Sequence, residues 1–339
     1  MSGDHGHGPS TPASAELESI KRPLAYGPVQ GDLALVEEAL AEASEIDSSP
    51  LAGMLSLVLT AGGKRLRPAL VLLAGQFGSY PVRKLTLLAA AIELLHTASL
   101  VHDDVIDGAE LRRGHPTVNT CYRNSTTVML GDYLFAHSAY LVTQTDNIRV
   151  VSLFARTLMF MARGEIGQDM SAYSLSQEPI SYLRHIGDKT ASLFATATEG
   201  GSILAGCPQE HVAALRHYGY NLGMAFQIVD DILDFNGDEW ELGKPAGSDL
   251  EQGTLTLPAL LYLRRQPGEN RIATFLAERH PEALAEAIAA VRGSGVLMEA
   301  QQVAQKYCRR ALRALEILPP TPARHTLAEL TDHVLQRQS

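Results

Sequence analysis

Cysteine is scarce in this sequence. The three that are present, Cys121, Cys207 and Cys308, lie far apart and form no CxxC pair. An odd number of scattered cysteines argues against a disulfide framework and against a zinc site. We therefore expect three buried, small apolar side chains in a reducing compartment.

Long apolar runs are absent as well. A helix that spans a bilayer needs about 18 uninterrupted apolar residues, whereas the richest stretch, Leu85 to Val101, contains Glu93 and His96. The N-terminal residues MSGDHGHGPSTPAS lack the apolar core of a secretory signal. The sequence therefore predicts no transmembrane segment and a cytoplasmic location.

Positive charge is in deficit. The chain carries 28 Lys and Arg against 38 Asp and Glu, which gives a formal net charge of -10. A protein that binds a nucleic acid backbone would show a basic stripe, so we expect no nucleic-acid partner. A local phosphate site is not excluded, because such a site depends on a cluster of residues and not on the net charge.

Sequence patterns typical of β-strands are also absent. No run of alternating apolar and polar residues is bounded by hairpin turns, whereas apolar residues at helical spacing follow Asp32, a typical N-cap residue. We expect long helices over residues 85–106, 131–144, 150–173, 180–205 and 211–235, breaks over 209–211 and 236–244, and shorter helices from Pro258 to about Gln336. The prediction is an all-α bundle of ten or more helices around a central elongated cavity.

The domain organisation follows from the same pattern. A length of 339 residues would by itself suggest about two domains, but one large helical domain is the better interpretation. Residues 1–15 are rich in Gly, Pro, Ser and His and are predicted to form a disordered tail. Residues 16–339 are then predicted to form a single all-α domain.

What the sequence does contain is a dense acidic cluster. Asp103, Asp104 and Asp107 form a DDxxD pattern at the C-terminal end of the apolar helix. Helical positions i, i+3 and i+4 share a face, so these carboxylates crowd together and repel one another. The helix macrodipole also disfavours anions at this end. An arrangement this unfavourable indicates that a cation binds there.

The same pattern recurs later in the chain. Asp230, Asp231 and Asp234 repeat it, again at the end of an apolar helix. Mg²⁺ binds through a few carboxylate oxygens and fills its shell with water and substrate phosphate, and oxygen-only ligands make it the default metal. Two facing clusters would therefore clamp a diphosphate through magnesium. Two solvated acidic helix ends are the alternative.

A glycine-rich basic turn offers a second anion site. In the stretch GGKRLRP (62–68) the glycines allow the backbone to approach an anion closely, and the N-terminus of a helix follows. Lys64 and Arg67 add positive charge, and arginine binds phosphate bidentately. A plain basic surface turn is the alternative.

Further cations lie beside the first cluster and later in the chain. They are Arg112, Arg113, Lys189 and Lys244. Arg112 and Arg113 either contact phosphate groups or form a surface set of salt bridges. His96 precedes Asp103 by about two helical turns, a spacing that suits a cavity residue and a core histidine equally well.

Together these residues resemble the trans-isoprenyl diphosphate synthases, the polyprenyl synthetase family. The matching stretches are GGKRLRP (62–68), HTASLVHDDVIDGAELRRGHPT (96–117), GD (131–132), KT (189–190), FQIVDDILDF (226–235) and GKPAGSDLEQGTLTLP (243–258). The resemblance implies the isoprenoid synthase type I fold. It also implies a magnesium-dependent, head-to-tail condensation of isopentenyl diphosphate with an allylic diphosphate, by ionisation, condensation and elimination.

The resemblance further implies a role for each matching position. The metal would be bound by Asp103, Asp107 and Asp230, with support from Asp104, Asp231 and Asp234. Isopentenyl diphosphate would be held by Lys64, Arg67, His96, Arg113, Phe226 and Gln227. The allylic diphosphate would be held by Arg112, Lys189, Thr190 and Lys244.

Product length is predicted from the positions that precede the first cluster. Ala98 and Ser99 stand where an aromatic floor stops growth in similar short-chain enzymes, and Leu94 and Leu95 lie further along the same helix. Because a close-packed wall admits little intrusion, the missing aromatic side chain predicts a product between hexaprenyl and decaprenyl. Thr254, where many family members carry lysine, points the same way. In the alternative, another helix forms the floor.

Other functions stay open at this point. A class I terpene cyclase shares the DDxxD motif and the helical fold, but it would lack the basic turn. The chain also resembles the catalytic component of two-part heptaprenyl synthases, which needs a small partner subunit, although a homodimer is the family default. A shorter-chain geranylgeranyl or farnesyl diphosphate synthase is a further alternative. A non-enzymatic regulatory subunit would have lost a cluster or the basic turn.

Overall fold

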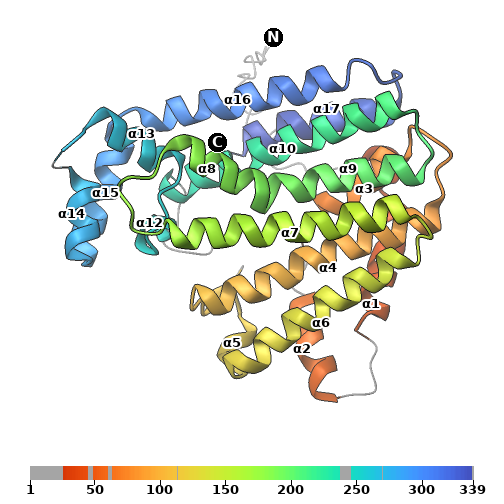
Figure 1. The fold of residues 1–339 in the computed structure, drawn as a ribbon, viewed down its shortest axis with the longest axis horizontal. Coiled ribbons are helices and arrows are strands. Elements are labelled where there is room, and N and C mark those ends of the chain that lie inside the picture. The colour runs from red at the N-terminus through yellow and green to blue at the C-terminus, as the bar shows by residue number, and fades with distance from the viewer. Residues whose placement is uncertain are drawn as a thin grey trace, which may run out of the picture.

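The computed structural model describes residues 26–44, 49–59, 63–112, 114–236, 246–268 and 270–337. Within these ranges more than ten α-helices follow one another and almost no strand is present (Figure 1). The all-α prediction is confirmed. The predicted tail, residues 1–15, lies outside the described residues, and a single domain over 16–339 stays a prediction.

The helices of the first half are α1 (Leu33–Glu42), α2 (Ser49–Leu59), α3 (Leu66–Gly75), α4 (Val82–Ile106), α5 (Val118–Cys121), α6 (Asn124–Thr143), α7 (Ile148–Met170) and α8 (Pro179–Ile186), with a short 3-10 helix, η3 (Gly27–Val29), before them. The second half contains the π-helix η4 (Gly187–Ala191), α9 (Ser192–Leu204), α10 (Gln209–Asn236), α12 (Ser248–Glu251), α13 (Leu257–Arg265), α14 (Arg271–Glu278), α15 (Pro281–Gly293), α16 (Val296–Ala314) and α17 (Pro322–Gln336). Strands β1 (Leu111–Arg112) and β2 (His115–Pro116) form an antiparallel hairpin.

Several local expectations need correction. Of the three cysteines expected to be buried, Cys308 is buried, whereas Cys207 is partly exposed and Cys121 is exposed. The break predicted over residues 209–211 lies instead before Gln209, where Gly206 adopts a φ of 70° and ends the preceding helix. Asp32 occupies the N-cap position of α1, but its carboxylate accepts a hydrogen bond from the Tyr80 hydroxyl and caps no helix N–H. The hairpin escaped prediction because strands of two residues carry no alternation.

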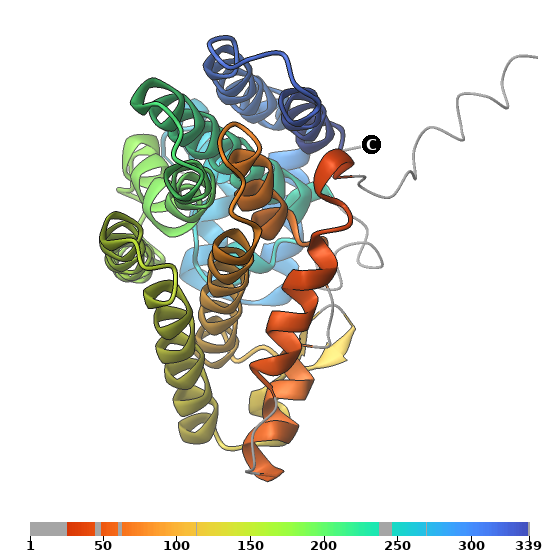
Figure 2. The ribbon, with the colours of Figure 1, turned by 90° about the vertical axis from the view of Figure 1, so that its right-hand side faces the viewer.

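Helix α4 lies at the centre of the N-terminal half. It packs against α1, α3, α6 and α9, and Figure 2 shows it between α6 on one side and α1 on the other. Its length and composition would suffice to cross a membrane, but 67% of its apolar window is buried inside the protein. A helix that is mainly apolar and mostly covered by its neighbours is a core helix.

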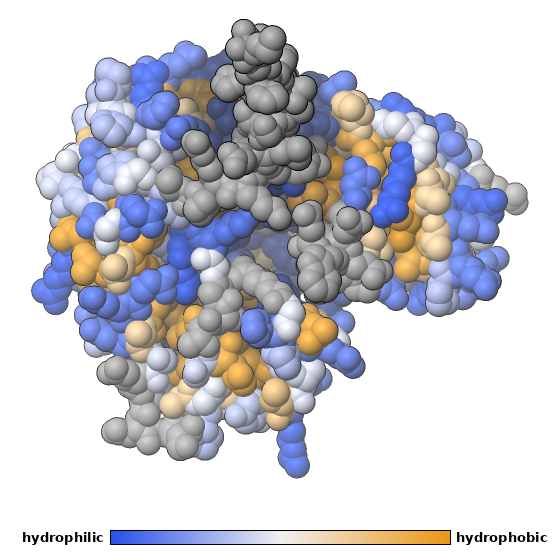
Figure 3. All heavy atoms as spheres, turned by 180° about the vertical axis from the view of Figure 1, so that it is seen from behind, coloured by the Kyte–Doolittle hydropathy of each residue, from blue (hydrophilic) through white to orange (hydrophobic). Residues whose placement is uncertain are grey.

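The long helices bring one set of ends together. In Figure 1 the C-terminal ends of α4, α7 and α10 all point toward the end of the molecule where α12 lies. Helices α12 to α15 form a lobe there, and the view from behind shows hydrophilic side chains with separate apolar patches over this lobe (Figure 3). The two DDxxD patterns therefore end at the same side of the bundle.

Candidate active site

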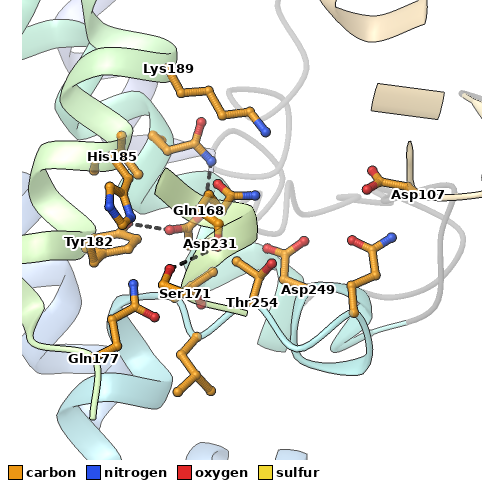
Figure 4. Close-up of a pocket in the computed structure, with 15 residues that line it drawn as sticks. Asp107, Gln168, Ser171, Gln177, Tyr182, His185, Lys189, Asp231, Asp249 and Thr254 are labelled. Carbon is orange, nitrogen blue, oxygen red and sulfur yellow. Dashed lines mark hydrogen bonds between the residues drawn. The ribbon is translucent and has the colours of Figure 1, made fainter. Parts of the chain in front are cut away.

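The ends of α4 and α10 face one cavity. Its volume is about 750 Å³, and its lining includes Asp103 of α4 with Asp230 and Asp231 of α10. A smaller cavity of about 130 Å³ shares Asp231 with it and is lined also by Asp107 and Asp249. Figure 4 shows Asp107, Asp231 and Asp249 among the residues that line this smaller cavity, with the Asp231 carboxylate turned toward Tyr182. Both clusters thus contribute carboxylates to the same site.

Within the first cluster, Asp103 and Asp104 differ in surroundings. Burial raises the pKa of Asp103 to about 6, and Glu165 adds to the rise while Lys189 opposes it. Asp104 is buried outside both cavities, where one carboxylate oxygen accepts hydrogen bonds from Nε and Nη2 of Arg112, both at 2.7 Å. Asp104 therefore fixes Arg112, and Asp103 is the carboxylate that the cavity exposes to a ligand.

Within the second cluster, Asp231 is fully enclosed. It accepts hydrogen bonds from the Tyr182 hydroxyl and, at 2.9 Å, from Nε2 of Gln227 (Figure 4). Burial raises the pKa of Asp231 above its usual range, and the nearby Asp249 carboxylate adds to the rise. A cation in the cavity would relieve this accumulation of negative charge.

The last carboxylate of the second cluster has a structural task. Asp234 is buried, and its two oxygens accept hydrogen bonds from the Ser248 hydroxyl at 2.9 Å and from the backbone N–H of Asp249 at 3.3 Å. It therefore holds the first turn of α12. Through that turn it places Asp249 at the edge of both cavities.

A π-helix carries the predicted Lys189 and Thr190. The Nζ atom of Lys189 lies 2.5 Å from Oε2 of Glu165, and the Thr190 hydroxyl donates to Oε1 of Gln227 at 2.7 Å. Burial alone would lower the pKa of Lys189, but Asp103 and Glu165 raise it above its usual range. Lys189 is therefore a cation held at the cavity, and single-turn π-helices frequently occur at functional sites.

The basic turn reaches the cavity through Arg67. Its guanidinium lies 4.8 Å from the centre of the Phe194 ring, and Phe194 packs against Phe226 with ring centres 5.2 Å apart. His96, Gln227 and Phe226 line the same cavity. Lys64 is exposed and does not line it. Arg113 and Lys244 lie outside the described residues.

The remainder of the main cavity is largely apolar. Ser99 lines it, and the apolar side chains around it come from α4, α6, α7, α9 and α10, among them Leu100, Phe135, Leu158, Met161, Leu193 and Leu233. Ala98, Leu94 and Leu95 are completely buried and do not belong to this lining. Of the four residues predicted to form the wall on α4, Ser99 alone lines this cavity, while α6 and α7 supply bulkier residues.

Three charged residues of the main cavity were not assigned from the sequence. Glu165 and Asp249 line the main cavity, as does Arg337, which follows α17 and lies 3.0 Å from Oδ1 of Asp230. Asp249 lies in the stretch 243–258 that resembles the family, so its role could have been predicted from the sequence. Glu165 and Arg337 had no such signal, because only the fold brings them to the aspartates.

The GD stretch owes its glycine to packing. The His102 ring lies against Gly131 so closely that a Cβ atom there would overlap it. Its Nε2 atom lies 2.9 Å from the backbone oxygen of Val128, and its ring meets Phe135 edge-on at 5.2 Å. Gly131 therefore allows α6 to approach the part of α4 that carries Asp103.

The donor set suits magnesium. Among the described residues no three His, Cys, Asp or Glu side chains form a ready-made metal cage. Mg²⁺ needs no such cage, since it binds through one or two carboxylates and completes its shell with water and substrate phosphates. Asp103, Asp107 and Asp230 offer such oxygens around the two cavities.

Comparison with known proteins bears on this site. Residues 48–293 match the polyprenyl synthetase family model. Heptaprenyl diphosphate synthase component 2 of Geobacillus stearothermophilus is 41% identical over 318 residues, which cover 94% of this chain and 99% of that protein. The all-trans-nonaprenyl-diphosphate synthase (geranyl-diphosphate specific) of Rhodobacter capsulatus is 39% identical, with coverage of 91% and 96%.

Solved structures agree. A polyprenyl synthase from Caulobacter crescentus, complexed with calcium and isoprenyl diphosphate, superimposes with a TM-score of 0.88 at 35% identity, over 92% of this chain and 96% of that one. The fold, the site and both kinds of comparison point to one family. The chain belongs to the polyprenyl synthetase family and is a trans-isoprenyl diphosphate synthase, a prenyltransferase.

Proposed function

We propose that this chain is a cytoplasmic, magnesium-dependent prenyltransferase that condenses isopentenyl diphosphate with an allylic diphosphate, head to tail, and releases diphosphate. The observation that carries the proposal is a single cavity in which Asp103 and Asp230 meet Arg67 and Lys189. Carboxylates for a metal and cations for two diphosphates thus surround one space. The apolar side of the same cavity suits a prenyl tail.

Each polar group has a task in this reaction. Lys189 and Arg112 balance the negative charge that develops on the departing diphosphate, which is electrostatic catalysis by groups already in place. Bound magnesium would supply further charge stabilisation at the same diphosphate. Thr190, fixed by Gln227, lies beside Lys189 where the allylic cation forms. The released diphosphate is the proton acceptor, and no protein base is assigned.

The product is proposed to lie between hexaprenyl and decaprenyl. The proteins named above make heptaprenyl and nonaprenyl diphosphates according to their names, and Ser99 brings no aromatic obstacle to the cavity. Purified protein should be incubated with radiolabelled isopentenyl diphosphate and farnesyl or geranylgeranyl diphosphate, and the products sized. Long products that disappear with EDTA support the proposal. Farnesyl diphosphate that is extended only to 20 carbons, with no extension of geranylgeranyl diphosphate, would place the chain among the shorter-chain synthases.

The assembly is proposed to be a homodimer formed through α6 and α7. These neighbouring helices expose large apolar side chains, Met129 and Tyr140 on α6 and Met159 and Met170 on α7. Exposed apolar groups that gather in this way mark an interaction surface. Light scattering should give twice the mass of the chain, and Met159→Glu should give monomers. A monomeric wild-type chain that elongates only with a second protein would favour the two-component alternative.

A further inference from the structure

One arginine of the basic turn points away from the cavity. Arg65 directly precedes α3 with φ 47° and ψ 33°, a left-handed conformation that residues other than glycine rarely adopt. Its side chain is only 14% exposed, and it does not line the main cavity. Its neighbour Arg67 does. The turn therefore divides its basic residues between two directions.

Arg65 fastens the turn to two other helices. Its Nε and Nη2 atoms donate to the two carboxylate oxygens of Glu37 on α1, at 2.6 and 3.0 Å. Its Nη1 atom donates to Oε1 of Glu93 on α4 at 2.9 Å. On the other side, the Tyr26 hydroxyl donates to the backbone oxygen of Lys64. The backbone on which Lys64 and Arg67 stand is thus held by side-chain contacts.

The contact with Glu93 connects the turn to the first aspartate cluster. Glu93 is buried and lies on the same helix as Asp103, about 15 Å away at the helical rise of 1.5 Å per residue. A single continuous helix that is mostly buried between its neighbours is a rigid connection. The ion pair therefore relates the position of Arg67 to that of Asp103.

Condensation depends on this relation. Two substrates react only when their reacting carbons are held about 3 to 3.5 Å apart, and each substrate is held by its diphosphate. A buried ion pair contributes little to stability once its desolvation is counted, so stability does not explain why Glu93 and Arg65 are paired. The pair is better explained by the position in which it holds the basic turn relative to α4.

We propose that Arg65 is a positioning residue, whose ion pair with Glu93 places the basic turn so that Arg67 holds isopentenyl diphosphate in register with the allylic diphosphate at Asp103. The inference rests on the proposed function. It predicts that the pair controls the affinity for isopentenyl diphosphate and leaves the affinity for the allylic substrate nearly unchanged.

The test compares substitutions that break the pair in two ways. Arg65→Gln leaves the Glu93 carboxylate buried without its partner, so that variant loses stability as well. The double variant Arg65→Met/Glu93→Leu removes both charges and leaves no buried charge behind. In the folded double variant, KM for isopentenyl diphosphate should rise at least tenfold, while KM for the allylic substrate stays within twofold. Equilibrium dialysis with radiolabelled isopentenyl diphosphate should show the same loss of affinity.

A matched control comes from an ion pair far from the site. Arg265 and Glu299 join α13 to α16 at 2.9 Å, and Arg265→Gln should change neither KM. Unchanged binding of isopentenyl diphosphate by the folded double variant would overturn the inference, and so would an equal rise in both KM values. If the wild-type chain elongates no primer, the proposed function fails, and the dialysis measurement still decides the role of Arg65.

Discussion

The two aspartate clusters have the same spacing and different internal arrangements. In α4 the first carboxylate, Asp103, faces the main cavity and the last, Asp107, lines the smaller one. The middle carboxylate, Asp104, is buried against Arg112. The first cluster thus keeps its outer members for a ligand and uses its middle member to fix an arginine.

In α10 the division of tasks is different. Asp230 and Asp231 line the cavity, and the last carboxylate, Asp234, is buried under the first turn of α12. The second cluster also has two protein partners within the site, Tyr182 and Gln227, while Asp230 meets Arg337. Identical motifs therefore acquire their roles from the residues that pack behind them, which the motif itself does not specify.

The largest expected effect comes from the carboxylate that faces the cavity in α4. Asp103→Ala should lower turnover by at least 10²–10³-fold, since it removes charge stabilisation at the departing diphosphate. Steady-state elongation assays under saturating substrates would measure this. Asp332→Asn, an exposed position on α17, is the control and should leave turnover unchanged. Near-normal turnover of Asp103→Ala would remove the first cluster from the metal site.

The buried members should have smaller and distinguishable effects. Asp104→Ala and Asp234→Ala should each weaken magnesium binding about 10- to 100-fold, the usual cost of losing a group that orients a ligand. They should differ in hydrogen exchange, because only Asp234 accepts a bond from the Asp249 N–H. Faster exchange over residues 248–251 is expected in Asp234→Ala alone. The same exchange pattern in both variants would show that the clusters do not divide their tasks in this way.

The pKa of Asp103 predicts a pH dependence of the metal-free protein. It is about 6 in the folded chain against an ordinary 3.8, so the folded state holds this proton more tightly than the unfolded state does. Stability should therefore fall as pH rises from about 4 to about 6, by up to about 1.4 kcal/mol per pH unit. Urea unfolding across this range would measure it. Asp103→Asn should flatten the dependence, and an equally steep fall in that variant would assign it to other groups.

The smallest expected effect concerns Arg337. Its ion pair with Asp230 is partly exposed, with side-chain accessibilities of 23% and 34%, so it contributes at most about 1 kcal/mol. Because arginine and magnesium compete for the same carboxylate, Arg337→Gln should lower the half-saturating magnesium concentration by about two- to fivefold. Arg324→Gln, on α17 and hydrogen-bonded to the Leu318 carbonyl, is the control. Weaker magnesium binding by Arg337→Gln would contradict a competing role.

Much of the architecture was predictable because it depends on local pattern. The apolar spacing of α4 and α10 predicted both helices, and the position of the aspartates at their ends predicted that the clusters share a cavity. The direction of each side chain was not predictable. Asp104 and Asp234 turn into the protein because they accept hydrogen bonds there from Arg112 and Ser248. Only tertiary packing brings those partners near.

The π-helix between α8 and α9 could not be predicted from the apolar pattern either, because it too depends on tertiary packing. The expected helix over 180–205 is continuous in periodicity, whereas the structure inserts Gly187–Ala191 with a wider turn. A π-turn accommodates one residue more than an α-turn does. Nothing in the composition of this stretch distinguishes it from ordinary helix. We attribute the wider turn to the packing of α7 and α10 around η4.

That wider turn also limits how the gene can change. Deleting a single codon within residues 187–191 would restore a regular α-turn and leave the registers of the flanking helices unchanged, because the π-turn had absorbed the extra residue. Lys189 would then lose its position opposite Glu165, while α9 kept its buried face against α3. A deletion here would therefore damage the cavity and spare the packing of the bundle.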